Sequence, residues 1–354
     1  MRTRARVFAT IAATTAAIIL VGAQTQTKVP RTAWGAPDLQ GLWNTNTLVP
    51  LERNQQYGTR AQMTEEEHAR ALADLQQRNQ RPGRDSREIA GKSGVGTEKD
   101  VARAYNEFWF GDKPTKLSYR TSMIIDPPNG RLPAYTPEAT KRIADKREFL
   151  AALLQGTSGG RPGPISPRRK DSSPDYNLDR INRADGPEDR GGPERCLGDN
   201  LPVTMGTGTF GGVMQVVQSP DSVSVYYDVG QGQGFAWVIP ITNRPHLPKN
   251  IQLYRGDAIG HWEGDTLVVD VSNLSEKTNY RGSRETLHLK ERFYRAGGNL
   301  RYEVTADDPQ TWTRPWTAAL DMAPQPDGMF EYACHEGNNS MRNILSGARA
   351  AEKK

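Results

Sequence analysis

From about residue 200 onward the chain is a succession of short apolar segments separated by turn residues, and this pattern constrains the fold most strongly. Leu267, Val269 and Val271 alternate with Val268 and Asp270, which is the period of two of a half-buried β-strand. We therefore expect a β-rich core. Strands are predicted at 213–217, 223–227, 235–239, 251–254, 267–271, 287–293 and 300–304, with a glycine-containing hairpin loop at 296–299.

The N-terminal half carries helix signals instead. Thr64, followed three residues later by Glu67, has the pattern of a capping box and predicts a helix start. Thr136, Pro137 and Glu138 predict a second start, for a helix that runs to about residue 154. A further helical or mixed stretch is expected at 99–110, and strands are expected at 41–43 and at 120–126, the latter with Met123, Ile124 and Ile125 buried.

The first 23 residues are typical of a secretory signal peptide. Arg2, Arg4 and Arg6 form a basic start, residues 7–21 are small and apolar, and Ala23 precedes the expected cleavage. The alternative is an uncleaved anchor, for which the apolar run is short. We expect a periplasmic or secreted protein.

Charge and cysteine content exclude several classes of protein. The formal net charge is +5, and cleavage of the signal peptide removes three arginines and no acidic residue, which lowers it to +2. Because no basic stripe is present, we expect no nucleic-acid partner. Two cysteines exclude a four-cysteine zinc site. No internal stretch reaches the roughly 20 apolar residues of a membrane span, so no transmembrane anchor is expected after cleavage.

These features predict a β-rich α+β fold, an antiparallel barrel or sandwich with peripheral helices. The expected organisation is an N-terminal strand plus helical segment (24–155), a Gly/Pro-rich linker (156–199), the β-rich core (200–345) and a tail (346–354). The Gly41-Leu42-Trp43 segment resembles the Gly-x-Trp opening of lipocalin-like barrels, a short motif that points to the barrel.

Several motifs together resemble a family of exported bacterial proteins that has no secure reaction. The motifs are RTSMIIDPPNGRLP (120–133), NRPHLP (243–248), GHWEGDTLVV (260–269), ETLHLKERF (285–293), TRPWT (313–317) and YACHEGN (332–338). The resemblance covers most of the mature chain. It departs at 227–235, where the family carries a segment similar to Met-Ile-His-Asp and this chain has a Gly/Gln run. Because the family has no secure reaction, the resemblance implies no mechanism for this chain.

Histidine placement is the most informative feature for function. Four of the five histidines, His246, His261, His288 and His335, fall within the last 109 residues, at long spacings. They converge only if the strands bring them together. Imidazole is both an acid–base group and a ligand for zinc, copper or iron. We expect His246, His288 and His335 to supply acid–base chemistry, and a divalent metal is the alternative.

The segment Cys334-His335-Glu336 combines three reactive side chains. We expect Cys196 and Cys334 to form a disulfide, since export favours oxidation. The alternative is that Cys334 is a nucleophile. On a strand His335 would face away from Cys334 and would share a cavity with His288. Glu336 is expected to assist it.

Aromatic residues near Arg314 suggest a place for substrate. Arg314 beside Trp316 has the composition of a site that stacks a ring and binds a carboxylate, or of a plug that closes a barrel end. Trp262 and Tyr332 are further candidate substrate-binding residues.

The sequence thus predicts an enzyme of the hydrolase or lyase type, which acts on a small organic or glycan-like substrate. The alternatives are a non-catalytic small-molecule-binding barrel and a structural envelope protein.

Overall fold

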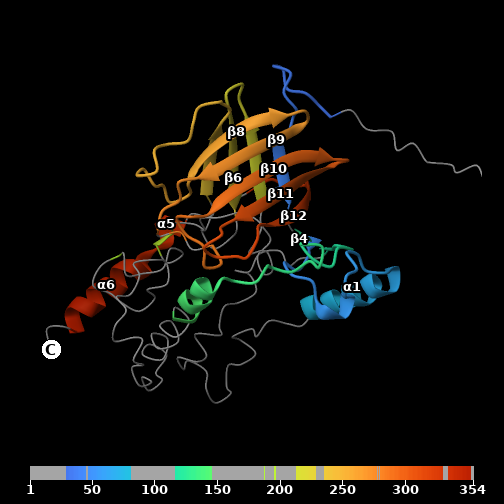
Figure 1. Ribbon diagram of the computed structural model, residues 1–354, viewed down its shortest axis with the longest axis horizontal. Helices are drawn as coiled ribbons and strands as arrows, with labels where there is room; N and C mark the ends of the chain where they lie inside the picture. Colours follow the sequence, from blue (N-terminus) through green and yellow to red (C-terminus); the bar gives the residue numbers. More distant parts are fainter. Residues whose placement is uncertain are drawn as a thin grey trace, which may run out of the picture.

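The computed structural model describes residues 29–44, 47–80, 116–145, 187, 195–196, 213–228, 235–276, 278, 280–329 and 334–351. Within them, ten antiparallel strands form one continuous sheet (Figure 1). The strands of this sheet are β1 (Gly41–Asn44), β4 (Ile124–Asp126), β5 (Val213–Gln218), β6 (Ser222–Asp228), β7 (Phe235–Pro240), β8 (Asp257–Glu263), β9 (Thr266–Ser272), β10 (His288–Ala296), β11 (Asn299–Asp307) and β12 (Trp316–Pro324).

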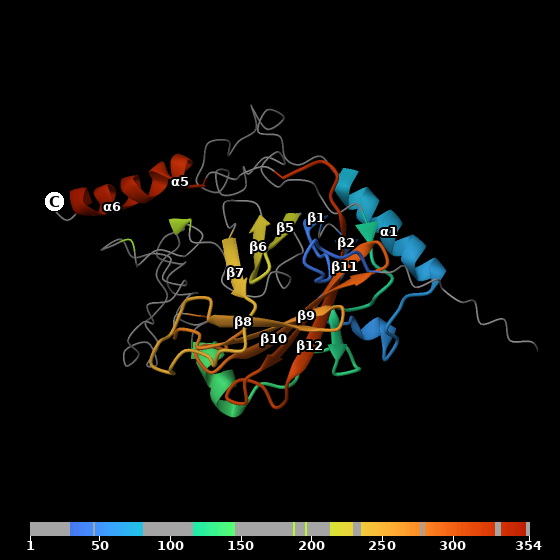
Figure 2. The same ribbon diagram turned by 90° about the horizontal axis from the view of Figure 1, so that it is seen from above.

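The strand order is β7-β6-β5-β1-β12-β11-β10-β9-β8, with β4 also paired to β12. Two antiparallel meanders, β5–β7 and β8–β12, lie on either side of β1 (Figure 2). Trp43 of β1 is opposite Met214 of β5 and Pro324 of β12. β1 and β4, which correspond to the strands predicted at 41–43 and 120–126, are therefore part of the sheet formed by the C-terminal strands.

The predicted β-rich α+β class with antiparallel strands is confirmed, but of the predicted barrel or sandwich the structure shows one sheet that is not closed as a barrel. Its two ends, β7 and β8, are joined only by a single parallel bridge between Ile241 and Gly260 in the part of the chain that the structure describes. The amide of Thr242 donates to the carbonyl of Gly260 at 3.1 Å. Gly260 allows this approach, because a Cβ there would lie 2.9 Å from carbons of Ile239 and Ile241.

One face of the sheet, which we call the inner face, carries the apolar core, and the opposite face is the outer face. On β10, Leu289 and Phe293 are buried on the inner face, while His288 and Lys290 are on the outer face. This alternation follows from the period of two along a strand. The inner-face core also contains the fully buried side chains of Trp43, Tyr302, Trp312 and Trp316.

Helices lie around the sheet. The expected capping box is confirmed at α1 (Glu65–Gln80), where the Thr64 hydroxyl accepts from the Glu67 amide at 3.2 Å and the Glu67 carboxylate accepts from the Thr64 amide at 2.9 Å. A helix also begins at Pro137, and the Thr136 hydroxyl caps it. The other small elements are η1 (Gln55–Tyr57), a separate two-stranded sheet of β2 (Thr47–Leu48) and β3 (Lys116–Leu117), α5 (Cys334–Gly337) and α6 (Asn339–Ala351).

No helix in the described ranges combines the length and the apolar character needed to cross a membrane. The predicted helix at 99–110 lies outside the described residues, as does nearly all of the 156–199 linker. The predicted strand at 251–254 is a loop with an isolated bridge at Leu253. Ile125, expected to be buried, is 39% exposed, because β4 turns it to the opposite side from Ile124.

Candidate functional site

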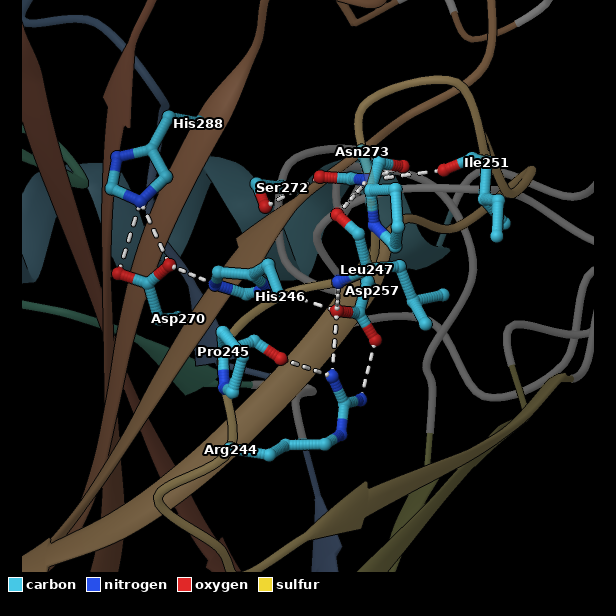
Figure 3. A network of polar contacts seen from close by, with 11 residues as sticks. Arg244, Pro245, His246, Leu247, Ile251, Asp257, Asp270, Ser272, Asn273 and His288 are labelled. Carbon is cyan, nitrogen blue, oxygen red and sulfur yellow. Dashed lines mark hydrogen bonds and ion pairs between the residues drawn. The ribbon is translucent and has the colours of Figure 1, made fainter.

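Four side chains meet where β8 and β9 approach the segment that connects β7 to β8 (Figure 3). They are His246, Asp257, Asp270 and His288, which we call the His–Asp cluster. His246 comes from the connecting segment, Asp257 begins β8, Asp270 lies on β9 and His288 begins β10. Strand pairing brings them together: β9 lies between β8 and β10.

Asp270 is the centre of the cluster, because both histidines contact its carboxylate. The distance from Nε2 of His246 to Oδ1 of Asp270 is 2.7 Å. Nε2 of His288 lies 3.0 Å from both carboxylate oxygens. Burial by itself raises the pKa of Asp270, but the hydrogen bonds with His288 and His246 outweigh it and hold the pKa below its ordinary value. Asp270 is therefore a carboxylate at neutral pH.

His246 lies between two carboxylates. Its Nδ1 is 2.9 Å from Oδ2 of Asp257, while its Nε2 faces Asp270. A carboxylate only accepts hydrogen bonds, so both contacts are hydrogen bonds when both ring nitrogens carry a proton. The imidazolium form of His246 satisfies this arrangement, and the two carboxylates balance its charge.

Asp257 is the buried anchor of the cluster, with 4% of its surface exposed. Arg244 donates to both of its oxygens, at 2.6 and 3.0 Å, and the Leu247 amide donates at 2.9 Å. The Arg244 guanidinium is the main reason that the pKa of Asp257 lies well below its ordinary value, since burial acts in the opposite direction. The charge of Asp257 is thus compensated in the fold.

Asn273 fixes the backbone of the connecting segment. Its amide nitrogen lies 2.9 Å from the carbonyl oxygen of Leu247 and 3.0 Å from those of Pro248 and Ile251. Asn273 has a φ of 56°, in the left-handed region that asparagine adopts more readily than most residues. Two anchors, Asp257 and Asn273, therefore hold the segment that presents His246.

His288 is the accessible member of the cluster. Its side chain is 44% exposed, against 27% for His246 and 31% for Asp270. Because Asp270 accepts from Nε2, the proton of a neutral His288 ring is on Nε2 and the lone pair is on Nδ1. Nδ1 points away from Asp270 in Figure 3 and has no hydrogen-bond partner in the described part of the chain.

A second unusual acid lies on the inner face. Glu291 is 1% exposed on β10, and its Oε2 has no hydrogen-bond partner among the described residues. Burial raises its pKa to about 8, and a hydrogen bond with Tyr302 opposes this rise only in part. Glu291 is therefore mainly a neutral acid at pH 7.

The structure brings together two of the three histidines expected to act. The premise that placed His335 beside His288 is wrong, because His335 and Glu336 lie on α5 and not on a strand. Both are exposed, and no contact of the described side chains connects them to the His–Asp cluster. The local sequence Cys-His-Glu-Gly fits a strand or one helical turn equally well.

The expected substrate-binding residues do not meet at the cluster. Arg314 forms an exposed ion pair with Asp126 at 2.8 Å. Trp316 is fully buried and packs against Trp312 in the core. Trp262 is partly buried against the same core, and Tyr332 lies outside the described residues.

Asp270 is the functional candidate that the sequence did not single out. The sequence pattern that could have identified it is Val269-Asp270-Val271. This alternation places one acidic residue on the outer face of a strand whose other residues are mostly apolar. The same reasoning marks Glu291, which falls on the apolar face with Leu289 and Phe293.

Two further sequence predictions concern a metal site and a disulfide. Among the described residues, no group of three or more His, Cys, Asp or Glu side chains is arranged to hold a metal ion. Cys196 is disulfide-bonded, and Cys334 is the other cysteine of the sequence. The pairing of the two stays a prediction, because the Cys334 side chain lies outside the described part.

No protein-family model and no curated protein matches the chain. Among solved structures, it is similar to zebrafish ileal bile acid-binding protein complexed with cholic acid, at 13% identity over 33% of this chain and 74% of that one, with a TM-score of 0.23. It is also similar to a secretory abundant heat soluble protein from Ramazzottius varieornatus, at 11% identity over 35% and 79% of the two chains, with a TM-score of 0.24.

A third similar structure is a single-residue mutant of the fluorescent protein UnaG, at 10% identity over 38% of this chain and 86% of that one, with a TM-score of 0.23. At these scores the similarities do not define the function of this chain.

Proposed function

We propose that this protein binds a small organic or glycan-like molecule at the outer-face His–Asp cluster. The observation that carries the proposal is that Asp270 holds Nε2 of both His246 and His288 while His288 stays 44% exposed. Polar groups that are already oriented lose little conformational freedom when a ligand arrives, and this favours binding.

The chemistry of the cluster indicates what kind of ligand fits. Nδ1 of a neutral His288 accepts a hydrogen bond, so a hydroxyl or amine group of the ligand suits it. Lys290, exposed on the same face of β10 and opposite Asp270 in the β9 register, adds a cation for an acidic or carbonyl oxygen. A small molecule with both a donor and an acceptor matches these two groups.

Acid–base catalysis of the hydrolase or lyase type is the second candidate function. The orientation of His288 by Asp270 favours it, because a carboxylate that fixes the tautomer of an imidazole is a common arrangement in general bases. Both candidates use the same residues, and turnover distinguishes them.

Two further expectations belong to this proposal. The basic and apolar start of the chain supports export to the periplasm or the cell exterior. The motifs that resemble the family of exported bacterial proteins include His246 in NRPHLP and Asp270 directly after GHWEGDTLVV, so we propose that other members carry the same cluster.

The test is a fragment screen by ligand-observed NMR with small hydroxy acids, sugars and amines. Ligands that bind the wild type should bind the double variant Asp270→Ala/His288→Ala at least tenfold more weakly. They should bind His261→Ala normally, because His261 is equally exposed on neighbouring β8 and contacts only Glu263 among the described side chains. Equal binding to wild type and double variant would refute the proposal, as would a library without any ligand.

A further inference from the structure

We infer that His288 is a general base for the attack of water on carboxylic esters of small alcohols, with Asp270 as its positioning residue. The inference rests on the proposed function only in that it uses the same cluster. It assigns a reaction, a substrate class and separate roles to two side chains. Three features carry it: the tautomer of His288, the hydrogen bonds that orient Asp270 and the charges around the ring.

The tautomer of His288 follows from its contact with Asp270. Both carboxylate oxygens lie 3.0 Å from Nε2, and a carboxylate cannot donate a hydrogen bond. The Nε2 position is therefore the protonated one in the neutral ring. The basic lone pair is left on Nδ1, which points away from Asp270 (Figure 3), on a side chain that is 44% exposed.

A chain of hydrogen bonds orients Asp270 toward His288. His246 contacts its Oδ1 at 2.7 Å, and His246 is itself held by Asp257 through Nδ1 at 2.9 Å. Asp257 in turn is fixed by the paired hydrogen bonds from Arg244. The chain Arg244–Asp257–His246–Asp270 is thus a support for the base, built from charge-assisted hydrogen bonds.

The charged groups that face His288 suit the reaction. When Nδ1 takes up a proton, the resulting imidazolium is beside the Asp270 carboxylate, which stabilises it. Asp307 of β11 is the cross-strand partner of His288 and adds a second negative charge from the other side. Lys290 lies two residues from His288 on the same face of β10, and its cation would stabilise an oxyanion that develops on this face.

The reaction balances with water as the only co-reactant. The oxygen of a water molecule forms a bond with the acyl carbon while one of its protons passes to Nδ1 of His288. Collapse of the tetrahedral intermediate breaks the bond between the acyl carbon and the alcohol oxygen, and the leaving oxygen takes the proton from Nδ1. The products are a carboxylic acid and an alcohol, and His288 and Asp270 return to their initial state.

The test uses p-nitrophenyl acetate and follows the release of p-nitrophenolate. We expect His288→Ala and Asp270→Asn to lower the second-order rate constant at least tenfold, since general-base catalysis contributes about 10²–10⁴-fold. In Asp270→Asn the amide can donate to Nε2 and thereby move the ring proton to Nδ1. The matched control His261→Ala removes a histidine of similar exposure, 46% against 44% for His288, and should retain the wild-type rate.

Two further readouts separate catalysis from a structural role. After subtraction of the reaction of free imidazole with the ester, added imidazole should restore the rate of His288→Ala and not that of Asp270→Asn, which a merely destabilised protein would not show. The ¹⁵N NMR shifts of the His288 ring should report the Nε2-protonated tautomer in the wild type and its loss in Asp270→Asn. A general base moves a proton of water in the transition state, so the protein-catalysed rate should fall in D₂O. A smaller isotope effect on this rate than on the uncatalysed hydrolysis would overturn the role of His288 as a base.

The outcomes also separate this inference from the proposed function. Wild-type protein that binds fragments at the cluster but hydrolyses no ester above the His288→Ala rate overturns the inference and leaves the binding proposal standing. Ester hydrolysis that depends on His288, without any fragment bound, overturns the binding proposal alone. Loss of the wild-type rate with EDTA, and its return with Zn²⁺, would overturn the inference, because the base would then act through a metal.

Discussion

At the scale of single residues, the two unusual acids of β10 and its neighbour β9 differ through their surroundings. Asp270 is on the outer face, where two histidines favour its charged form. Glu291 is on the inner face among apolar side chains, where Tyr302 offsets only part of the loss of water. At neutral pH the outer face therefore carries the ionised Asp270, and the inner face carries Glu291 mainly in its neutral form.

Glu291 makes the stability of the fold dependent on pH. Its folded pKa of about 8 lies above the ordinary value of 4.5, so the folded state binds the proton more tightly than the unfolded chain. The associated stability is fully present below pH 4.5 and is lost as the pH rises to 8, at up to about 1.4 kcal/mol per pH unit. Chemical denaturation of the wild type between pH 5 and pH 8 should show this decrease.

Glu291→Gln should remove most of that pH dependence, because the amide has a similar shape and does not ionise. Glu285→Gln is the matched control, since Glu285 is exposed near the start of the same strand. If Glu291→Gln and the wild type lose stability in parallel over this range, the burial of a neutral acid at Glu291 is contradicted.

At the scale of elements, the segment between β7 and β8 supplies His246 to the His–Asp cluster, and Asn273 holds this segment in place. Asn273→Ala should cost about 2 kcal/mol, because the two N–H groups that three carbonyl oxygens share are lost and the left-handed backbone is strained. Asn273→Asp retains a residue that tolerates this backbone but removes the N–H donors. Hydrogen exchange at residues 246–252 should increase in both variants.

The control for Asn273 is Ser272→Ala, which removes only the hydroxyl that donates to Oδ1 of Asn273. It should leave hydrogen exchange in the segment close to the wild type. Protection in Asn273→Asp equal to that of the wild type would mean that other contacts hold the segment.

Sequence patterns predicted the elements whose residues signal them locally, and they failed where tertiary pairing decides. β9, β10 and β11 have clear alternation and were found. β12 was missed because Ala318 and Ala319 blur its alternation, although β4 and β11 pair with it. β8 was missed because its buried residues, 257–260, are consecutive and do not alternate, and Gly260 among them is explained only by its approach to β7.

The candidate site shows the same limit. Alternation placed His288 on a polar face, but no local pattern indicates that residues 246 and 257 are held beside residue 270. Asp270 joins the two histidines only because β9 lies between β8 and β10. The site is therefore a product of strand order, which sequence periodicity does not encode.

At the scale of the whole molecule, β1 connects two meanders that are separate in sequence. β1 pairs with β5 on one side and β12 on the other, and Trp43 is 2% exposed between them. Its indole donates to the Leu39 carbonyl at 3.1 Å, and Arg295 of β10 lies over its ring at 4.3 Å. The N-terminal strand is thereby part of the common core and not an appendage.

The opposite ends of the sheet meet at Gly260, so this residue tests whether their contact stabilises the fold. Gly260→Ala places a Cβ 2.9 Å from Cγ2 of Ile239 and from Cδ1 of Ile241. The Ile241 atom is the end of a flexible side chain, but the Ile239 atom is close to the backbone of β7 and cannot move alone. We expect a loss of about 1–3 kcal/mol in the free energy of unfolding, as for other overpacked cores. Gly298→Ala is the control, because nothing lies within 4 Å of the added Cβ there.

A double variant tests the contact directly. In Gly260→Ala/Ile239→Ala, the new methyl group occupies part of the space that Ile239 vacates. The losses of unfolding free energy in the two single variants should therefore sum to more than the loss in the double variant. Strictly additive costs would mean that the added methyl group does not press on Ile239, and that the close approach of β7 to β8 at Gly260 is not the source of the lost stability.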